Sequence, residues 1–262
     1  MRIATWNVNS VRARQERLLA WLARQAPDVV CLQELKVESA QFPLGALRAA
    51  GYHAVVEGQR TYNGVAILAR EEPTEVVRGL CDDADDPQAR LIAATVRDVR
   101  VLSAYVPNGA EVGSDKWAYK LDWLRRLTVY LEQHHRADRP LALCGDLNLA
   151  PEARDVHDPA LWEGSVLFHA DLRTAFARLE TWGLADAFRV HHAESGLYSW
   201  WDYRMLAFPR NHGLRIDHIL VTAPLKARCS ACAIDRDERK GKQPSDHAPV
   251  VADFALDAEG RG

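Results

Sequence analysis

The chain has 262 residues, 48% of them hydrophobic, and a formal net charge of −3. A chain of this length and composition can bury one large core, and mixed sandwiches of this size are often one domain. Residues 71–86 alone carry a net charge of −6, which leaves +3 for the rest of the chain. The overall acidity therefore does not exclude a local basic face that binds phosphates.

Short apolar runs bounded by turn residues recur along the chain and predict β-strands. The runs cover residues 3–8, 29–32, 52–56, 64–69, 76–78, 91–96, 100–106, 141–144, 216–221, 228–233 and 248–254. Amphipathic spacing predicts three helices, one from a Ser10 cap to Arg24, one over residues 114–135 and one from Leu172 to Thr181. Because strands and helices do not alternate strictly, we expect an α+β fold in which two packed sheets carry helices outside. We expect one domain over residues 1–256, followed by a short polar tail at 257–262.

The cysteines and the start of the chain bear on the cellular compartment. Cys31 and Cys144 lie in apolar runs and are expected to be buried thiols, whereas Cys229 and Cys232 lack a second pair that would complete a zinc site. There is no signal peptide, and no apolar run reaches the roughly 18 residues needed to span a bilayer. We expect a cytoplasmic protein with no membrane partner.

The predicted 114–135 helix is rich in basic residues. We expect these side chains to contribute a basic face for phosphates. They are Lys116, Lys120, Arg125 and Arg126, set against Asp115 and Asp122.

Four polar clusters stand at the ends of apolar runs, at residues 5–9, 33–34, 145–148 and 244–247. They are rich in Asn, Asp, Glu and His, and together they predict one polar site at the edge of a β-core. Such groups can hold a divalent ion, orient a water molecule and stabilise charge that develops on a phosphate.

The spacing of the asparagines and acids allows two interpretations. Asp146 and Asn148 lie two residues apart, so a continuing strand would place them on one side, where the carboxylate can deprotonate a water and the amide can orient it. Gly-Asp-x-Asn is also ordinary turn chemistry. Asn7 and Asn9 repeat the spacing, and Asn9 can instead cap the next helix.

Glu34 and His247 have similar alternatives. Glu34 follows a predicted strand and is either a surface acid or an oxygen ligand of the kind that Mg²⁺ prefers. His247 follows Asp246, but neighbours on a strand face apart. A carboxylate from elsewhere, such as Asp217, is better placed to hold the imidazole and favour its charged form.

Residues 198–204 are dense in aromatic side chains and include Trp200. Aromatic residues interleaved with arginine form stacking surfaces in nucleic-acid enzymes, although they are also common in cores.

Taken together, the motifs resemble the exonuclease III family of AP endonucleases, within the wider endonuclease/exonuclease/phosphatase superfamily. The resemblance runs nearly from end to end of the chain. It rests on residues 5–9 with Arg12, 32–36, 62–66, 105–109, 145–148, 199–204, 214–217 and 245–247.

The resemblance implies a four-layer sandwich, two packed and mostly antiparallel β-sheets flanked by helices, with the site at one end of the sheets. It also implies a Mg²⁺ cofactor, for which Mn²⁺ would substitute. Glu34, helped by Asn7, would anchor the metal, and Asp246 would act as a second metal or support ligand.

The resemblance further implies the catalytic roles. Asp146 would activate the attacking water and Asn148 would position it, while His247, held by Asp217, would donate to a phosphate oxygen. The phosphate would also be contacted by Tyr105 and Asn108.

The substrate would be duplex DNA with an abasic site or a blocked 3′ end. Trp200, Leu214 and Ile216 match the family's apolar pocket for the baseless sugar, and Arg12 matches a basic position that follows the first strand. Ser10 stands where the family often has Gly, and residues 151–172 correspond less well, so that segment could tune abasic-site cleavage against 3′-end trimming.

The implied activity is cleavage 5′ to an abasic site, with 3′–5′ exonuclease and 3′-phosphatase activity at the same site. The resemblance also implies that the protein is a monomer and that it works at the nucleoid in a bacterial-type cytoplasm. One alternative is the same chemistry on a phosphoinositide, sphingomyelin or RNA. The other is a nucleic-acid-binding relative without catalysis.

Overall fold

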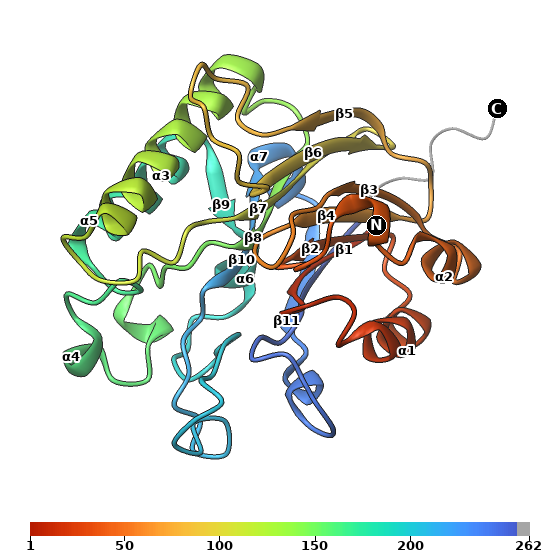
Figure 1. The fold of residues 1–262 in the computed structure, drawn as a ribbon. Coiled ribbons are helices and arrows are strands. Elements are labelled where there is room, and N and C mark those ends of the chain that lie inside the picture. Colours follow the sequence, from red (N-terminus) through yellow and green to blue (C-terminus); the bar gives the residue numbers. More distant parts are fainter. Residues whose placement is uncertain (256–262) are drawn as a thin grey trace.

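Two six-stranded β-sheets pack face to face in the computed structural model, which describes residues 1–255 (Figure 1). The tail predicted at 257–262 lies outside the described residues. The strands of the first sheet are β1 (Arg2–Asn7), β2 (Val29–Gln33), β3 (His53–Glu57), β4 (Val65–Ala69), β11 (Cys229–Ile234) and β12 (Val250–Phe254). Those of the second are β5 (Thr74–Arg78), β6 (Leu91–Val96), β7 (Val99–Tyr105), β8 (Leu141–Asp146), β9 (Leu184–Asp186) and β10 (Asp217–Thr222).

The strand order is β11-β12-β1-β2-β4-β3 in one sheet and β5-β6-β7-β8-β10-β9 in the other. Only β1–β2 and β7–β8 are parallel among the pairs of these sheets, so the expected pair of mostly antiparallel sheets is confirmed.

Helices cover the outer faces of both sheets (Figure 1). The helices are α1 (Gln15–Gln25), α2 (Leu44–Ala49), α3 (Asp115–His134), α4 (Pro159–Trp162), α5 (Ala170–Trp182), α6 (Ala187–His191) and α7 (Ala223–Lys226), with 3₁₀ turns at Ser39–Gln41, Ala153–Asp155 and Arg236–Arg239. Of these, α6 and α7 pack Phe188 and Leu225 into the layer between the sheets and not onto an outer face. Within residues 1–255, no helix combines the length and apolarity that crossing a membrane requires.

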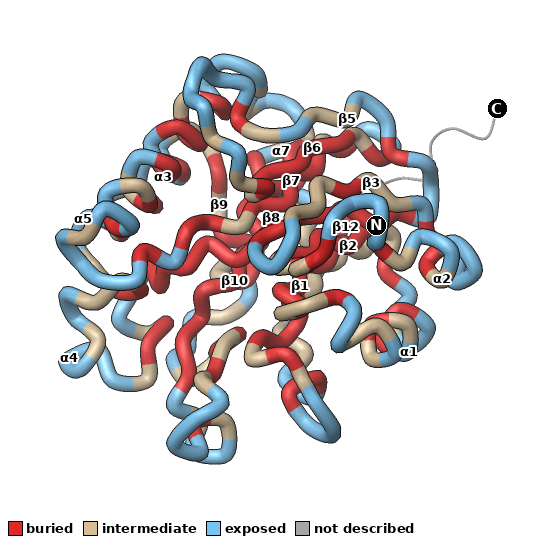
Figure 2. The backbone as a smooth tube through the Cα atoms, in the orientation of Figure 1, coloured by how far each residue is buried: buried red, intermediate tan, exposed pale blue. Residues whose placement is uncertain are grey.

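Three buried layers hold the sandwich together. Side chains such as Ile67 and Ile219 fill the space between the sheets. Trp21 of α1 packs on the outer face of the first sheet, and Leu127 of α3 packs on the outer face of the second. Figure 2 shows the result as buried strands through the centre and exposed outer helical turns and loops. The alternation of layers explains why the strand runs are apolar on both faces.

The predicted helix cap at Ser10 is wrong, because α1 begins only at Gln15. Ser10 has a φ of 86°, and its backbone N–H donates to the carbonyl of Glu34 over 2.8 Å. The chain therefore follows the segment after β2 before it turns into the helix. By contrast, α3 and α5 lie within two residues of their predicted bounds, and Ser114 and Gly183 flank them.

The basic face predicted on α3 is smaller than its sequence suggested. Lys120 is 0% exposed, and Arg126 is 9% exposed. Arg126 is held by Asp82 and Asp86, so part of the acidic 71–86 segment neutralises this helix rather than facing solvent. Lys120 lies on the apolar face of the helix because it follows Trp117 by one turn.

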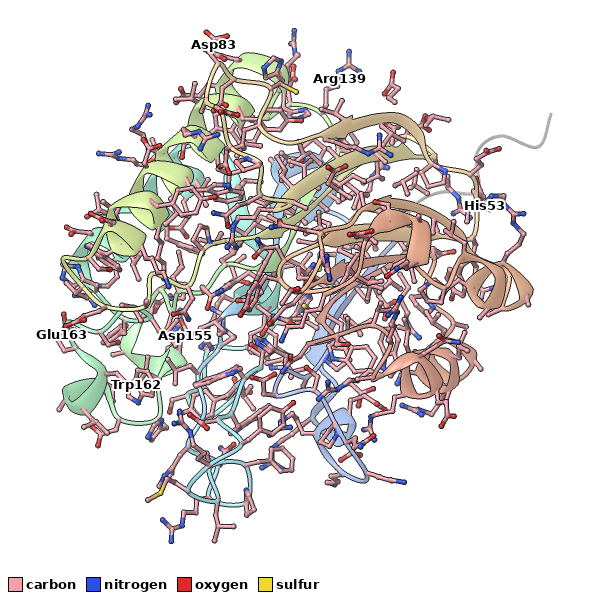
Figure 3. All side chains as sticks on the ribbon, viewed as in Figure 1. His53, Asp83, Arg139, Asp155, Trp162 and Glu163 are labelled. Carbon is pink, nitrogen blue, oxygen red and sulfur yellow. The ribbon has the colours of Figure 1, made fainter. Side chains whose placement is uncertain are left out.

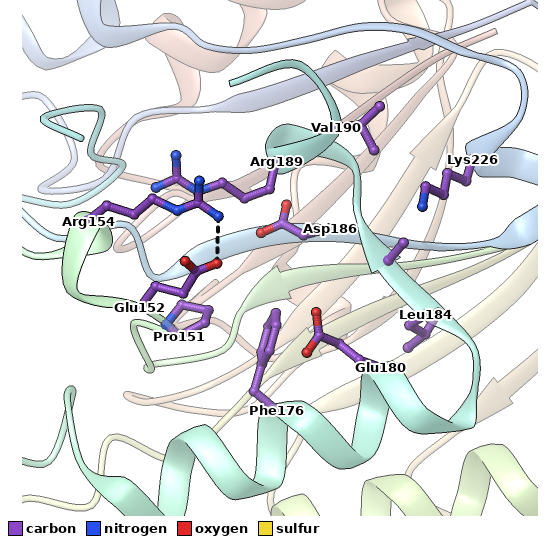
Figure 4. Close-up of a pocket in the computed structure, with 11 residues that line it drawn as sticks. Pro151, Glu152, Arg154, Phe176, Glu180, Leu184, Asp186, Arg189, Val190 and Lys226 are labelled. Atoms are coloured by element: carbon purple, nitrogen blue, oxygen red, sulfur yellow. Dashed lines mark hydrogen bonds and ion pairs between the residues drawn. The ribbon is translucent and has the colours of Figure 1, made fainter. Parts of the chain in front are cut away.

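A buried ionic cluster fixes the chain just before β10. Arg215 contacts Asp155 through Nε over 2.7 Å and Asp186 through Nη1 over 2.7 Å, and Arg189 also bonds Asp155. Figure 3 shows Asp155 inside the molecule, with Trp162 and Glu163 nearer its periphery. Asp186 and Arg189 also line a cavity of ≈ 600 Å³ (Figure 4).

Burial alone would raise the pKa of both carboxyls in this cluster. Arg215 outweighs that effect and holds the pKa of Asp155 and of Asp186 below their usual range. The cluster connects the 3₁₀ turn at Ala153–Asp155 to β9 and to the residues that enter β10.

Arg215→Met should destabilise the protein by about 3–5 kcal/mol at neutral pH, because it leaves buried carboxylates without their main partner. In the parent, the stability that these carboxylates contribute is complete above an unfolded-state pKa of about 3.9 and is lost as the pH falls through the lower folded-state values. The folded-state pKa values rise in the variant, so it should lose less stability than the parent as the pH falls, and the difference in stability between the two proteins should narrow in acid. Urea unfolding across a pH series measures both effects.

Arg136→Met is the matched control, because Arg136 pairs with Asp138 on the exposed surface. It should change stability far less. Equal urea midpoints for R215M and the parent would show that the buried cluster does not stabilise the fold.

Candidate active site

Strand register brings three predicted site residues into one row across the second sheet. Asp146 at the end of β8 pairs with Asp217 of β10 on one side and with Tyr105 of β7 on the other. In the first sheet Asn7 at the end of β1 pairs with Gln33, and Glu34 follows directly. The sheets therefore deliver their polar residues to one end of the sandwich.

His247 lies just before β12 and joins the two sheets. Its Nδ1 lies 2.9 Å from Asp217 Oδ2, and its Nε2 lies 3.7 Å from Asp146 Oδ2. Burial opposes a charge on the ring, but Asp217 and Asp146 outweigh it and raise the pKa of His247 to about 10. At neutral pH the ring is therefore an imidazolium, a hydrogen-bond donor at both nitrogens.

Asp146 is almost completely buried. Burial raises its pKa to about 7, His247 works against this rise, and Asp217 adds to it. Asn7 Nδ2 donates to Asp146 Oδ2 over 2.9 Å, and the backbone N–H of Asn148 donates to Oδ1 over 2.9 Å. A carboxyl poised near neutral pH and held by fixed donors suits general-base work.

Glu34 stands next to Asp146 at the open side of the cluster. Asn7 Nδ2 donates to its Oε2 over 3.0 Å, and Lys36 Nζ lies 2.9 Å from its Oε1. The Asn7 amide oxygen accepts from the backbone N–H of Asn9 over 2.9 Å. Asn7 thus presents N–H donors to Glu34 and Asp146, which makes it an orienting group for these carboxylates rather than an oxygen donor beside them.

Asp246 lies on the other flank of this end of the sandwich. It accepts from Asn9 Nδ2 over 2.9 Å and from Trp200 Nε1 over 3.1 Å. Burial would raise its pKa, but His247 and these two donors lower it below the usual range. Asp246 is therefore ionised, as a metal or support ligand must be.

Asn148 and Asn108 form a third side of the candidate site, after those of Glu34 and Asp246. Asn148 has a φ of 49°, so it lies in a turn and not on a continued strand. The Asn148 Nδ2 donates to the carbonyl of Val106 over 2.9 Å, and the Asn148 Oδ1 accepts from Asn108 Nδ2 over 3.2 Å. Burial and the carboxylates of Glu34, Asp146 and Asp246 raise the pKa of Tyr105 well above its usual value, so its hydroxyl stays protonated.

The residues of the predicted sugar pocket share one apolar cluster. Trp200 pairs with Leu214 through backbone hydrogen bonds of 2.9 and 3.0 Å, and Phe168 packs in the same cluster. Leu214 is 0% and Ile216 is 1% exposed, whereas Trp200 is partly exposed. Trp200 is thus the member of the three that a ligand can reach directly, and Leu214 and Ile216 lie behind it.

Arg12 lies apart from the other predicted site residues. Its Nη2 donates to Gln41 Oε1 over 2.6 Å, and it lines a cavity of ≈ 500 Å³ together with Lys36 and Arg60. Because Lys36 also contacts Glu34, this basic cavity borders the site without being part of its centre.

Sequence reasoning missed two residues that support this site. Ser199 Oγ donates to Asp217 Oδ2 over 2.6 Å and accepts from the backbone N–H groups of Ile216 and Asp217. Lys120 contacts the carbonyls of Asn108 and Asn148. Nothing local distinguishes Ser199, but Lys120 could have been found, because it is a lysine on the apolar face of a helix.

The donor chemistry fits a hard divalent cation near Glu34. Within residues 1–255, Asp146, Asp217 and His247 are the group whose ligand atoms all lie within 4.8 Å. The protonated His247 ring has no free lone pair for a metal. Carboxylate oxygens at Glu34 and Asp246 remain, and such oxygens are the preferred ligands of Mg²⁺.

Asp217→Asn should lower the pKa of His247, because a neutral amide replaces the carboxylate that contributes most to holding the charge. An NMR titration of the imidazole protons measures this shift. His157, whose pKa burial lowers, serves as an internal control and should titrate as in the parent. An unchanged His247 titration would show that Asp217 does not hold the ring charge.

Comparisons with known proteins agree with this geometry. The endonuclease/exonuclease/phosphatase family matches residues 4–247. The chain is 36% identical to exodeoxyribonuclease III of Haemophilus influenzae, with 97% of this chain and 100% of the relative covered. It superposes on an AP endonuclease from Archaeoglobus fulgidus at 41% identity and a TM-score of 0.95, covering 98% of this chain and 100% of the other. A 3′ phosphatase from Neisseria bound to a product DNA hairpin gives 42% identity and a TM-score of 0.94, again with 98% and 100% covered. The chain therefore belongs to the endonuclease/exonuclease/phosphatase family, and its resemblance to the exonuclease III branch is confirmed.

Proposed function

We propose that the chain is a Mg²⁺-dependent DNA repair phosphodiesterase that cleaves duplex DNA 5′ to abasic sites and trims 3′ ends and 3′ phosphates. The observation that carries the proposal is the buried line Asp217–His247–Asp146, with Asn7 joining Asp146 to Glu34. This arrangement supports the assignment of Asp146 as the general base, His247 as the cationic donor and Glu34 as a metal-binding carboxylate.

The reaction is in-line attack of water on phosphorus. Asp146 accepts the proton of the attacking water, whose direction is set by the Asn148 amide, and the new P–O bond forms as the P–O3′ bond breaks. His247 donates to a non-bridging phosphate oxygen, where negative charge builds up. Tyr105 keeps its hydroxyl proton and, with Asn108, donates to the same phosphate.

A bound Mg²⁺ would be held by Glu34 and Asp246, would withdraw charge from the phosphate oxygens and would be replaceable by Mn²⁺. Asn7 and Lys36 fix the Glu34 carboxylate in advance. Pre-oriented ligands of this kind reduce the reorganisation that metal binding requires.

DNA as the substrate is supported by the relatives, one of which is bound to a product DNA hairpin. It is also supported by the basic cavity of Arg12, Lys36 and Arg60 beside Glu34, which suits a phosphate backbone. Partly exposed Trp200 would shelter a flipped-out abasic sugar. We also propose that the protein is a monomer and that it works at the nucleoid in the cytoplasm, by analogy with the bacterial exodeoxyribonuclease III relative.

Asp146→Asn tests the proposal directly. On a duplex with one abasic-site analogue, and on a duplex with a 3′ phosphate, it should lose about 10²–10⁴-fold in kcat, the size expected for removal of a general base. DNA binding should remain, because the amide keeps the shape of the side chain. Asp138→Asn, a change at an exposed carboxyl, is the control and should cleave like the parent.

Binding and cleavage by the parent protein in the same assay also distinguish the alternative functions. Binding of both duplexes without cleavage in Mg²⁺ would indicate a non-catalytic relative, and cleavage of a phosphoinositide, sphingomyelin or RNA alone would indicate another substrate. Near-parental turnover by folded D146N would exclude Asp146 as the base.

Glu34→Gln should raise the Mg²⁺ concentration that gives half-maximal cleavage, because a charged oxygen ligand becomes a neutral amide. Glu57→Gln, on the edge strand β3 of the same sheet and paired with Arg78, is the matched control. Titration of both variants after EDTA treatment gives the midpoints. A parental midpoint for E34Q would place the metal anchor elsewhere.

A further inference from the structure

Lys120 is a buried cation that the proposed reaction does not use. It lies in α3 on the face that packs against the second sheet, and its side chain is 0% exposed. A charged ammonium is costly to bury unless polar partners replace its water. The groups around its ammonium therefore indicate the role of Lys120.

Three backbone carbonyls surround the ammonium. Lys120 Nζ donates to the carbonyl of Asn108 over 3.0 Å, to that of Asn148 over 2.6 Å, and to that of Val166. An ammonium has three N–H donors, so each one has a partner. The acceptors come from three loops, two of which carry the site residues Asn108 and Asn148.

The loop that carries Asn108 also leaves room for the aliphatic part of the Lys120 side chain. Gly109 has a φ of 96°, and a Cβ at this position would lie 3.0 Å from Lys120 Cδ and 3.3 Å from the Trp117 ring. The absence of a side chain at residue 109 thus leaves room for Lys120 directly beside Asn108.

The charge of Lys120 has no direct counter-ion. Within residues 1–255, no carboxylate lies within ion-pair distance of Nζ, and the nearest acid that affects it is Asp146. Burial lowers the pKa of Lys120 to about 7, while Asp146 works in the other direction. The three carbonyls favour the ammonium as well, since each accepts a hydrogen bond from Nζ and none can donate one.

We propose that Lys120 is a positioning residue for phosphodiester cleavage that acts through Asn148. It fixes the backbone of Asn148 directly, and it fixes Asn108, whose amide donates to the Asn148 side chain. The inference rests on the proposed function. Lys120 cannot touch DNA, because it is completely covered. Its effect should therefore appear in kcat, where correct placement of the asparagine amides matters, and not in KM.

The competing explanation is that Lys120 only stabilises the fold. Both explanations predict a lower melting temperature when the lysine is removed, since three buried carbonyls lose their donor. They differ in kinetics. A purely structural lysine would affect turnover independently of Asn148, whereas a positioning lysine has no further effect once the Asn148 amide is gone.

The experiment is a double-mutant cycle with Lys120→Met and Asn148→Ala, measured on the abasic-site duplex at saturating Mg²⁺. Asn148→Ala should lower kcat by about 10²-fold, as misplacement of the attacking water does. Lys120→Met should lower kcat by about 10-fold to 100-fold with KM within about threefold of the parent. The double variant should match Asn148→Ala within about threefold.

Leu127→Ala is the stability control, because it opens a cavity in the same helix far from the carbonyls. It should lower the melting temperature and keep parental kcat at a temperature where all variants are folded. If Lys120→Met does not fold, Lys120→Gln, which keeps two N–H donors without the charge, takes its place in the cycle.

Parental kcat in Lys120→Met, or multiplied losses in the double variant, would overturn the positioning role. So would a loss that Leu127→Ala reproduces at an equal melting temperature. The proposed function is tested separately by the parent. If the parent cleaves neither duplex, the function is wrong, and if it cleaves while Lys120→Met cleaves equally well, only the positioning role is wrong.

Discussion

The charged line Asp217–His247–Asp146 is the constraint on which the rest of the structure depends. Two carboxyls and an imidazolium are buried together, and each would be costly alone. They are tolerated because the His247 ring lies between the two acids and hydrogen-bond donors satisfy their carboxylates. Asp146 and Asp217 come from adjacent strands of one sheet, while His247 enters the other. The line therefore forms only when both sheets pack in register.

The surrounding polar groups complete this arrangement. Ser199 donates to Asp217, and Asn7 together with the Asn148 backbone donates to Asp146. Because buried acceptors with several fixed donors hold their position, the carboxylates are oriented before a substrate arrives. Asp146 is thus held at both of its carboxylate oxygens by protein donors.

Sequence reasoning predicted the strands other than β9, and it predicted that polar strand ends gather at one end of the sandwich, because apolar runs and polar strand ends are local signals. It failed where tertiary contacts decide the outcome. Ser10 looked like a helix cap, but the chain at Asn9 and Ser10 is held in the left-handed region beside the segment after β2. Asn148 reaches the site through a turn and not by strand periodicity. Lys120 and Arg126 looked like parts of a basic surface, because charge counting does not show that carbonyls and Asp82 lie against them. The assignment of roles came from the family resemblance and not from these local patterns.

Two buried cations connect the 151–172 segment to the chemistry. Lys120 holds the carbonyl of Val166 together with that of Asn148, and Arg215 holds Asp155 beside the residues that lead to Asp217. The segment also packs Phe168 against Leu214 and Ile216, behind Trp200. A shift of the segment to admit a sugar would therefore pull on the backbone of Asn148 and on the strand that carries Asp217. Substrate fit and the placement of the reacting groups therefore depend on the same contacts, since Lys120 and Arg215 each bond this segment and also a part of the chain that leads to the site.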